Sequence, residues 1–180
     1  MTPDHFGRAV DIRRPSVSQV YYAALEVERP QAWFRFQGRR GQEILFMLGV
    51  PVVERLKEYR PSIALLGPAL PPGELGFETP GGLGAAVYRG EGQPRLFHEH
   101  FTGTDSWIHL QVTRSLPDSG TYYLVAFTPQ NPRPGDKLWM SMGYLERFSF
   151  RDLWAFGRWR RNIRAFHELP SAADRHRASG

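Results

Sequence analysis

Short runs in which apolar and polar residues alternate make up most of the first 146 residues. Over residues 108–112 the alternation is complete, and it places His109 and Gln111 on the face away from the core. In the same way Phe34 and Phe36 share one face of a strand, and Trp33 lies on the other. β-branched and aromatic residues are frequent in these runs, which predict nine strands at 17–27, 32–37, 43–50, 62–66, 85–88, 96–101, 107–113, 121–127 and 137–148.

Glycine and proline separate these runs. The chain of 180 residues has 18 Gly and 15 Pro, so long helices do not fit between the predicted strands. Many short strands without intervening helices predict an all-β fold, an antiparallel jelly-roll-like β-sandwich over residues 17–148, preceded by an N-terminal arm at 1–16. Two Pro- and Gly-rich stretches, 66–84 and 128–136, interrupt the pattern, and loops of this length often carry binding function.

The spacing of apolar residues along the chain changes after the last predicted strand. Ser149 begins a Ser-x-x-acid sequence that is typical of a helix start, and Pro170 stops the pattern, so the sequence predicts an amphipathic α-helix at 149–170 and a flexible tail at 171–180. Aromatic and apolar residues recur on one stripe of this helix, and arginines gather on the opposite side. The stripe comprises Phe156, Trp159, Ile163 and Phe166.

The positive charge belongs to this C-terminal region. The chain has 23 basic and 18 acidic residues, a net charge of +5, which by itself would suggest a nucleic-acid partner. Residues 147–180 contain eight arginines and three acidic residues, whereas residues 1–146 contain 15 of each sign. The neutral body offers no broad basic surface along which a nucleic-acid backbone could lie, so the sequence disfavours nucleic acid.

The basic helix has three interpretations that the sequence leaves open. Its aromatic stripe packs on the sandwich, or lies in the interface of an anionic membrane, or docks on a protein partner such as a membrane complex. The last two predict an attachment surface made of Trp154, Phe156, Arg158, Trp159, Arg160, Arg161, Ile163, Arg164 and Phe166.

Three segments together resemble one known module. They are an aromatic strand with a Gly-Gln turn at 32–46, a short apolar strand ending in Gly-Pro at 61–68, and a "leucine, turn, Gly-Thr-Tyr-Tyr" sequence at 116–125. In this order they resemble the bacterial pre-peptidase C-terminal domain. The resemblance covers about 60% of the chain, residues 17–127. It implies a jelly-roll sandwich and a non-catalytic, appended role in secretion, targeting or substrate binding.

A possible metal site rests on histidine. His98 and His100 are two residues apart, so on a strand both imidazoles project from one face, and if Phe97 and Phe101 face the core that face is the outer one. His109 has the same outward assignment. Should the strands pair in register, the three could bind copper or zinc, with His5 as a fourth ligand. The alternative is a solvated sheet face without a cofactor.

Other chemistry is poorly represented. The chain has no cysteine, no Gly-x-Ser-x-Gly sequence and no phosphate-binding loop. It lacks an apolar run long enough to span a membrane, and its polar start has no signal-peptide pattern. We therefore expect a non-enzymatic accessory module peripheral to a membrane, on the cytoplasmic side if the chain is complete and outside the cytoplasm if a signal was removed. A metal protein or enzyme that uses the histidines is the alternative.

Overall fold

The computed structural model describes residues 4–144 and 152–169, with side chains from 159 onward in the last segment. Its elements run in the following order: η1 Phe6–Arg8, β1 Val10–Asp11, β2 Gln19–Ala24, β3 Gln31–Gly38, β4 Glu43–Pro51, η2 Glu54–Leu56, β5 Ser62–Gly67, β6 Gly84–Arg89, β7 Arg95–Glu99, β8 Thr104–Ser115, β9 Gly120–Phe127, β10 Lys137–Met142 and α1 Asp152–Phe166. The nine strands predicted from the alternation are confirmed with shifted ends. Residues 145–148 of the predicted last strand, and the predicted tail at 171–180, lie outside the described residues.

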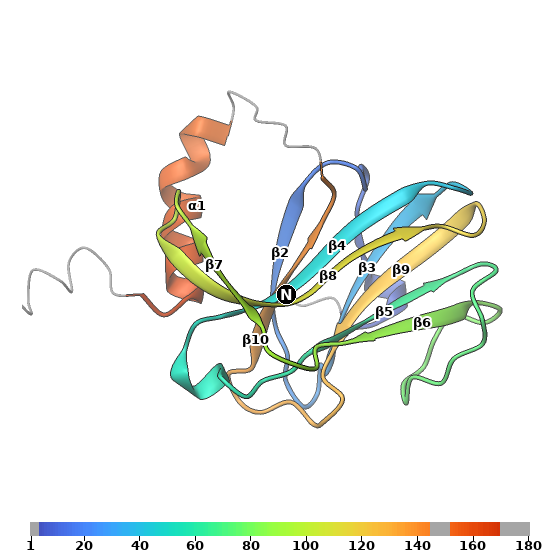
Figure 1. The fold of residues 1–180 in the computed structure, drawn as a ribbon, viewed down its shortest axis with the longest axis horizontal. Helices are drawn as coiled ribbons and strands as arrows, with labels where there is room; N and C mark the ends of the chain where they lie inside the picture. Colours follow the sequence, from blue (N-terminus) through green and yellow to red (C-terminus); the bar gives the residue numbers. More distant parts are fainter. Residues whose placement is uncertain (1–3, 145–151, 170–180) are drawn as a thin grey trace, which may run out of the picture.

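The described strands form two five-stranded sheets that pack face to face (Figure 1). The first sheet has the order β1-β3-β9-β5-β6, and the second has the order β2-β10-β4-β8-β7. Within the described ranges only the β5–β6 and β7–β8 connections stay in one sheet, and every other pair of consecutive strands crosses between the sheets, as in a jelly roll. The predicted all-β sandwich with a C-terminal helix is confirmed.

The N-terminal segment belongs to the sandwich. The predicted N-terminal arm, residues 1–16, is described from residue 4; β1 within it pairs in parallel with β3 at its edge, and Arg35 Nε donates a hydrogen bond to Asp11 Oδ1 at 2.7 Å. A strand of two residues is too short to produce an alternating pattern, so the sequence did not predict it.

The core between the sheets contains the Gly-Thr-Tyr-Tyr sequence. Tyr122 is fully buried there, and its ring stacks on Phe36 with 5.6 Å between centroids. Its hydroxyl donates to the carbonyl oxygen of Asp118 at 2.8 Å, at the entry to β9. Tyr123 points to the other face of the first sheet, as the strand period requires.

That other face carries a second hydrophobic cluster. Trp33, Leu66 and Val125 are buried in it although they lie outside the two-sheet core. The loop after β5 supplies Leu75 and Phe77 as a cover, and the N-terminal segment supplies Phe6 and Ala9. The first long Pro- and Gly-rich stretch therefore acts here as a lid over the outer face of the sheet.

Candidate functional site

Helix α1 is fixed to the second sheet by its C-terminal end. Ile163 is only 4% exposed, and the ring of Phe166 packs against that of Tyr22 on β2, with 4.8 Å between centroids. Figure 1 shows α1 beside β7, at the edge of this sheet. Burial of these two apolar side chains provides the nonpolar part of the attachment.

Polar contacts complete the docking of the helix end. Glu168 Oε1 accepts a hydrogen bond from Lys137 Nζ at 2.7 Å and also forms an ion pair with Arg55. Glu168 therefore connects Lys137 on β10 to Arg55 in the segment after β4. Its hydrogen bond with Lys137 is the main reason why the pKa of Glu168 is lowered. His167 is buried and donates from Nδ1 to the carbonyl oxygen of Asp105 at 3.0 Å, and burial lowers the pKa of its imidazole.

The β7–β8 turn lies against the same helix. Arg164 donates to the carbonyl oxygen of Thr102 in this turn at 3.0 Å. Together with Ile163 and Phe166, Arg164 therefore contacts the sandwich of its own chain, although the sequence predicted these three residues as part of the attachment surface. A helical period identifies an apolar stripe, but it cannot distinguish a stripe that meets the same chain from one that meets a partner.

The other residues of the predicted attachment surface form two groups, those that are described and exposed and those whose side chains are not described. Trp159, Arg160 and Arg161 are exposed on α1, and Trp159 is 47% exposed. Phe101, in the turn that Arg164 contacts, is 63% exposed. Trp154, Phe156 and Arg158 lie outside the residues whose side chains are described. Trp159, Arg160 and Arg161 are thus the exposed, described part of the predicted attachment surface, and their role in attachment stays a prediction.

The predicted histidine site is brought together only in part. The rings of His98 and His100 lie 4.9 Å apart between centroids, and His98 Nδ1 donates to Asp105 Oδ1 at 2.7 Å. His109 lies elsewhere, against Gly90, and His5 accepts a hydrogen bond from its own turn at Gly7. Over residues 4–144 and 152–169 no three His, Asp or Glu side chains converge in a way that could hold a metal ion.

Two structural details explain the displaced histidine. The β4–β8 register shifts between Leu48 and Gly49, so that Leu48 pairs with Leu110 and Gly49 with Ile108. His109 is the extra residue of this bulge, and the strict alternation that predicted it to point outward fails there. Phe97 and Phe101 do not face the core either, because they belong to the edge strand β7 and the turn after it.

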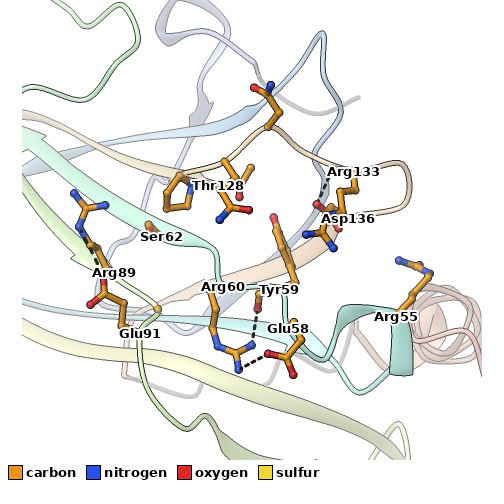
Figure 2. A pocket seen from close by; sticks show the side chains of 14 residues that line it. Arg55, Glu58, Tyr59, Arg60, Ser62, Arg89, Glu91, Thr128, Arg133 and Asp136 are labelled. Carbon is orange, nitrogen blue, oxygen red and sulfur yellow. Dashed lines mark hydrogen bonds and ion pairs between the residues drawn. The ribbon is translucent and has the colours of Figure 1, made fainter.

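A polar pocket lies at one end of the sandwich. The ends of β5 and β6, the segment after η2 and the 128–136 loop enclose a cavity of about 270 Å³, which we call the end pocket (Figure 2). Ser62 and Arg89, which line it, are cross-strand neighbours on β5 and β6, so their side chains share one face. Asp136 closes the loop because its Oδ2 accepts the backbone N–H of Arg133 at 2.8 Å.

Sequence reasoning did not identify this pocket. The 128–136 loop was recognised as a stretch that could bind something, and its proline and glycine content was the available signal. The pocket also needs Tyr59 and Arg60 from one segment and Arg89 from another. No spacing in the sequence relates these segments, because they meet only through the pairing of β5 with β6 and β9.

Comparison with known proteins concerns the fold. No protein-family model and no curated protein matches the chain. One similar solved structure is Aeromonas hydrophila PliG, a periplasmic lysozyme inhibitor of g-type lysozyme, at 12% identity and a TM-score of 0.42 over 75% of this chain and 96% of that one. Another is the pre-peptidase C-terminal domain of collagenase from Bacillus anthracis, at 10% identity and a TM-score of 0.37 over 75% and 92%. The second of these is a pre-peptidase C-terminal domain, the module that the sequence resembles.

No helix in the described part of the chain is long and apolar enough to cross a lipid bilayer.

Proposed function

We propose that the protein is a non-catalytic binding module that attaches to an anionic membrane surface through α1 and the β7–β8 turn. The observation that carries this proposal is an exposed tryptophan followed by two exposed arginines on a helix whose other end is fixed to a rigid sandwich. Tryptophan favours the boundary between headgroups and acyl chains, and arginine keeps its charge at the headgroups while its stem lies on apolar surface.

The charge distribution supports a membrane surface over other partners. Arg160 and Arg161 have no acidic neighbour in the exposed part of the helix from 159 to 162, and each contributes about 1 kcal/mol near an anionic surface. Phe101 adds an exposed aromatic side chain in the turn that α1 contacts through Arg164. Glu168 and Ile163 already hold the helix end on the sandwich. Membrane binding therefore costs less conformational entropy than it would if the whole helix had to become ordered.

Vesicle co-sedimentation tests this proposal. We expect the protein to sediment with vesicles of phosphatidylglycerol and phosphatidylcholine, to sediment much less with phosphatidylcholine alone, and to be released by high salt. The variant Trp159→Ala/Arg160→Glu/Arg161→Glu should lose most of this binding and keep its fold. A matched control, Arg39→Glu/Arg114→Glu, makes the same charge change at exposed positions on the body and should retain most of the binding.

Two results would contradict the proposal. One is an absence of binding to anionic vesicles by the folded protein, which would favour the alternative of a protein subunit in a membrane complex as the partner. The other is an equal loss of binding in the helix variant and in the body control, which would mean that overall charge, and not this surface, controls the association.

A further inference from the structure

The end pocket contains two buried hydroxyl groups that lack hydrogen-bond partners within the described ranges, Ser62 Oγ and Tyr59 Oη. Ser62 is completely buried. A buried polar group without a partner costs roughly 1–3 kcal/mol, so native proteins seldom keep one unless something else satisfies it. Two such groups lining one cavity indicate that the cavity has an occupant with hydrogen-bonding atoms.

The charged side chains of the pocket indicate the sign of the charge that the occupant carries. Arg55 is already engaged, because it donates to the carbonyl oxygen of Gly135 and pairs with Glu168. Arg89 comes no nearer than 4.0 Å to Glu91, whereas a charge-assisted hydrogen bond is about 2.8 Å long. Arg60 comes no nearer than 3.8 Å to Glu58, but its Nη1 donates to the carbonyl oxygens of Lys57 and Tyr59, so it is engaged like Arg55. Within the described part of the chain no acidic side chain forms an ion pair with the Arg133 guanidinium.

The acidic residues near the pocket do not neutralise it. The side chains of Glu58 and Glu91 are each 79% exposed, so water hydrates their carboxylates, and Asp136 is occupied by the backbone of Arg133. Figure 2 shows Arg89 and Arg133 on opposite sides of the cavity, with Ser62 and Tyr59 between them. Burial raises the pKa of the Tyr59 hydroxyl, so this group stays protonated and can donate.

Arg89, Arg133, Ser62 and Tyr59 thus offer hydrogen-bond donors to the cavity, and Gln130 and Asn131 line it with amide groups that can donate as well as accept. We propose that the end pocket binds a small ligand through an oxyanion group, a carboxylate or a phosphate, held by Arg89 and Arg133 and by the hydroxyls of Ser62 and Tyr59. Guanidinium groups match the geometry of both oxyanions. The cavity is slightly smaller than the roughly 300–1,000 Å³ typical of drug-sized sites, which fits a small polar molecule.

Calorimetric titration of the full chain with succinate, citrate and inorganic phosphate tests the proposal, with glucose as an uncharged probe. At least one oxyanion should bind with one site per chain, and glucose should not. Binding of phosphate alone would identify a phosphate ligand, and binding of succinate or citrate a carboxylate ligand, and either supports the proposal. If none of the three binds, or if glucose binds equally well, the proposal is wrong.

Variants separate this pocket from unspecific charge effects. Arg89→Gln should weaken binding about tenfold or more, because it removes a charged donor. Arg114→Gln makes the same change at an exposed position outside the pocket and should leave the affinity unchanged. Equal loss in both variants would overturn the assignment.

Ser62→Ala provides a second, independent readout. It should weaken binding about fivefold, yet leave the stability of the ligand-free protein unchanged or slightly higher, because it removes a buried hydroxyl that has no partner within residues 4–144 and 152–169. A loss of stability together with unchanged binding would show that the hydroxyl has a structural partner and would contradict the proposal. These outcomes do not depend on vesicle binding, which involves α1 and not this pocket.

Discussion

Replacement of Gly67 by alanine is expected to lower the free energy of unfolding by about 3 kcal/mol, the upper end of the usual cost of overpacking a core. A Cβ at this position would lie 2.1 Å from Cδ1 and Cε1 of Tyr122. The ring has little room to move away, because its other side lies close to Gly38, where an added Cβ would be only 2.8 Å from Tyr122 Cδ2. The ring also stacks on Phe36. The hydrogen bond from the hydroxyl to Asp118 fixes its far end.

Urea unfolding followed by fluorescence measures this effect. Gly81→Ala is the matched control, because a Cβ there would meet nothing within 4 Å and its backbone is not left-handed. It should change the unfolding free energy by less than about 0.5 kcal/mol. The double variant Gly67→Ala/Tyr122→Leu should be less destabilised than the sum of its single variants, because the clash is absent once the ring is removed. Additive effects would show that the ring does not impose glycine at this position.

The part of this core that the sequence predicted is local. Tyr122 and Tyr123 are adjacent, so the strand period is enough to place them on opposite faces, and the structure shows Tyr122 in the core and Tyr123 on the other face. The need for glycine at Gly38 and Gly67 comes from strands β3 and β5, which flank β9 only once the sheet is formed. No pattern within one segment contains that information.

The same distinction applies to the C-terminal helix. Its existence followed from the helical period, and the stripe through Ile163 and Phe166 is indeed apolar and partly buried. Which part of the stripe docks depends on Tyr22, Lys137 and other groups from distant strands, so the sequence could not assign it. For this reason the exposed, described part of the predicted attachment surface is smaller than the set of residues that the sequence named.

The candidate sites show where alternation stops being informative. Strict alternation gave His109 an outward position, but one extra residue in β8 interrupts the alternation there. The sequence pattern alone does not reveal such a β-bulge. The end pocket brings together hydroxyl and guanidinium groups from three segments. The lack of hydrogen-bond partners for the Ser62 and Tyr59 hydroxyls within the described residues is a property of the folded chain.

The half-buried position of His109 predicts a pH dependence of stability. Within the described residues neither ring nitrogen has a hydrogen-bond partner of normal geometry, and the ring lies close to Gly90. Burial is the main cause that lowers the pKa of His109 to about 4, and the positive charge of Arg60 adds to it, while the backbone of Gly90 offsets a part. In the unfolded chain the same imidazole titrates near its ordinary value of 6.5.

The sign of the effect follows from proton binding. Between pH 6.5 and 4 the unfolded chain binds a proton at His109 that the folded chain does not bind, so the free energy of unfolding falls as the pH is lowered through this range. Above pH 6.5 both states are neutral at His109 and the contribution is fully present. Because the ring is only half-buried, we expect a loss of about 2 kcal/mol, less than the full shift would give.

Urea unfolding at several pH values, for the wild type and for His109→Leu, measures this contribution. His167 also has a lowered pKa and acts in the same direction, so only the difference between the two proteins reports on His109. That difference should be constant above pH 7 and should shift in favour of His109→Leu by about 2 kcal/mol on lowering the pH to 4. Parallel curves over the whole range, or an NMR titration that places the pKa of His109 at or above 6.5, would show that its imidazole is hydrated in the folded protein. The bulge in β8 would then not bury this side chain.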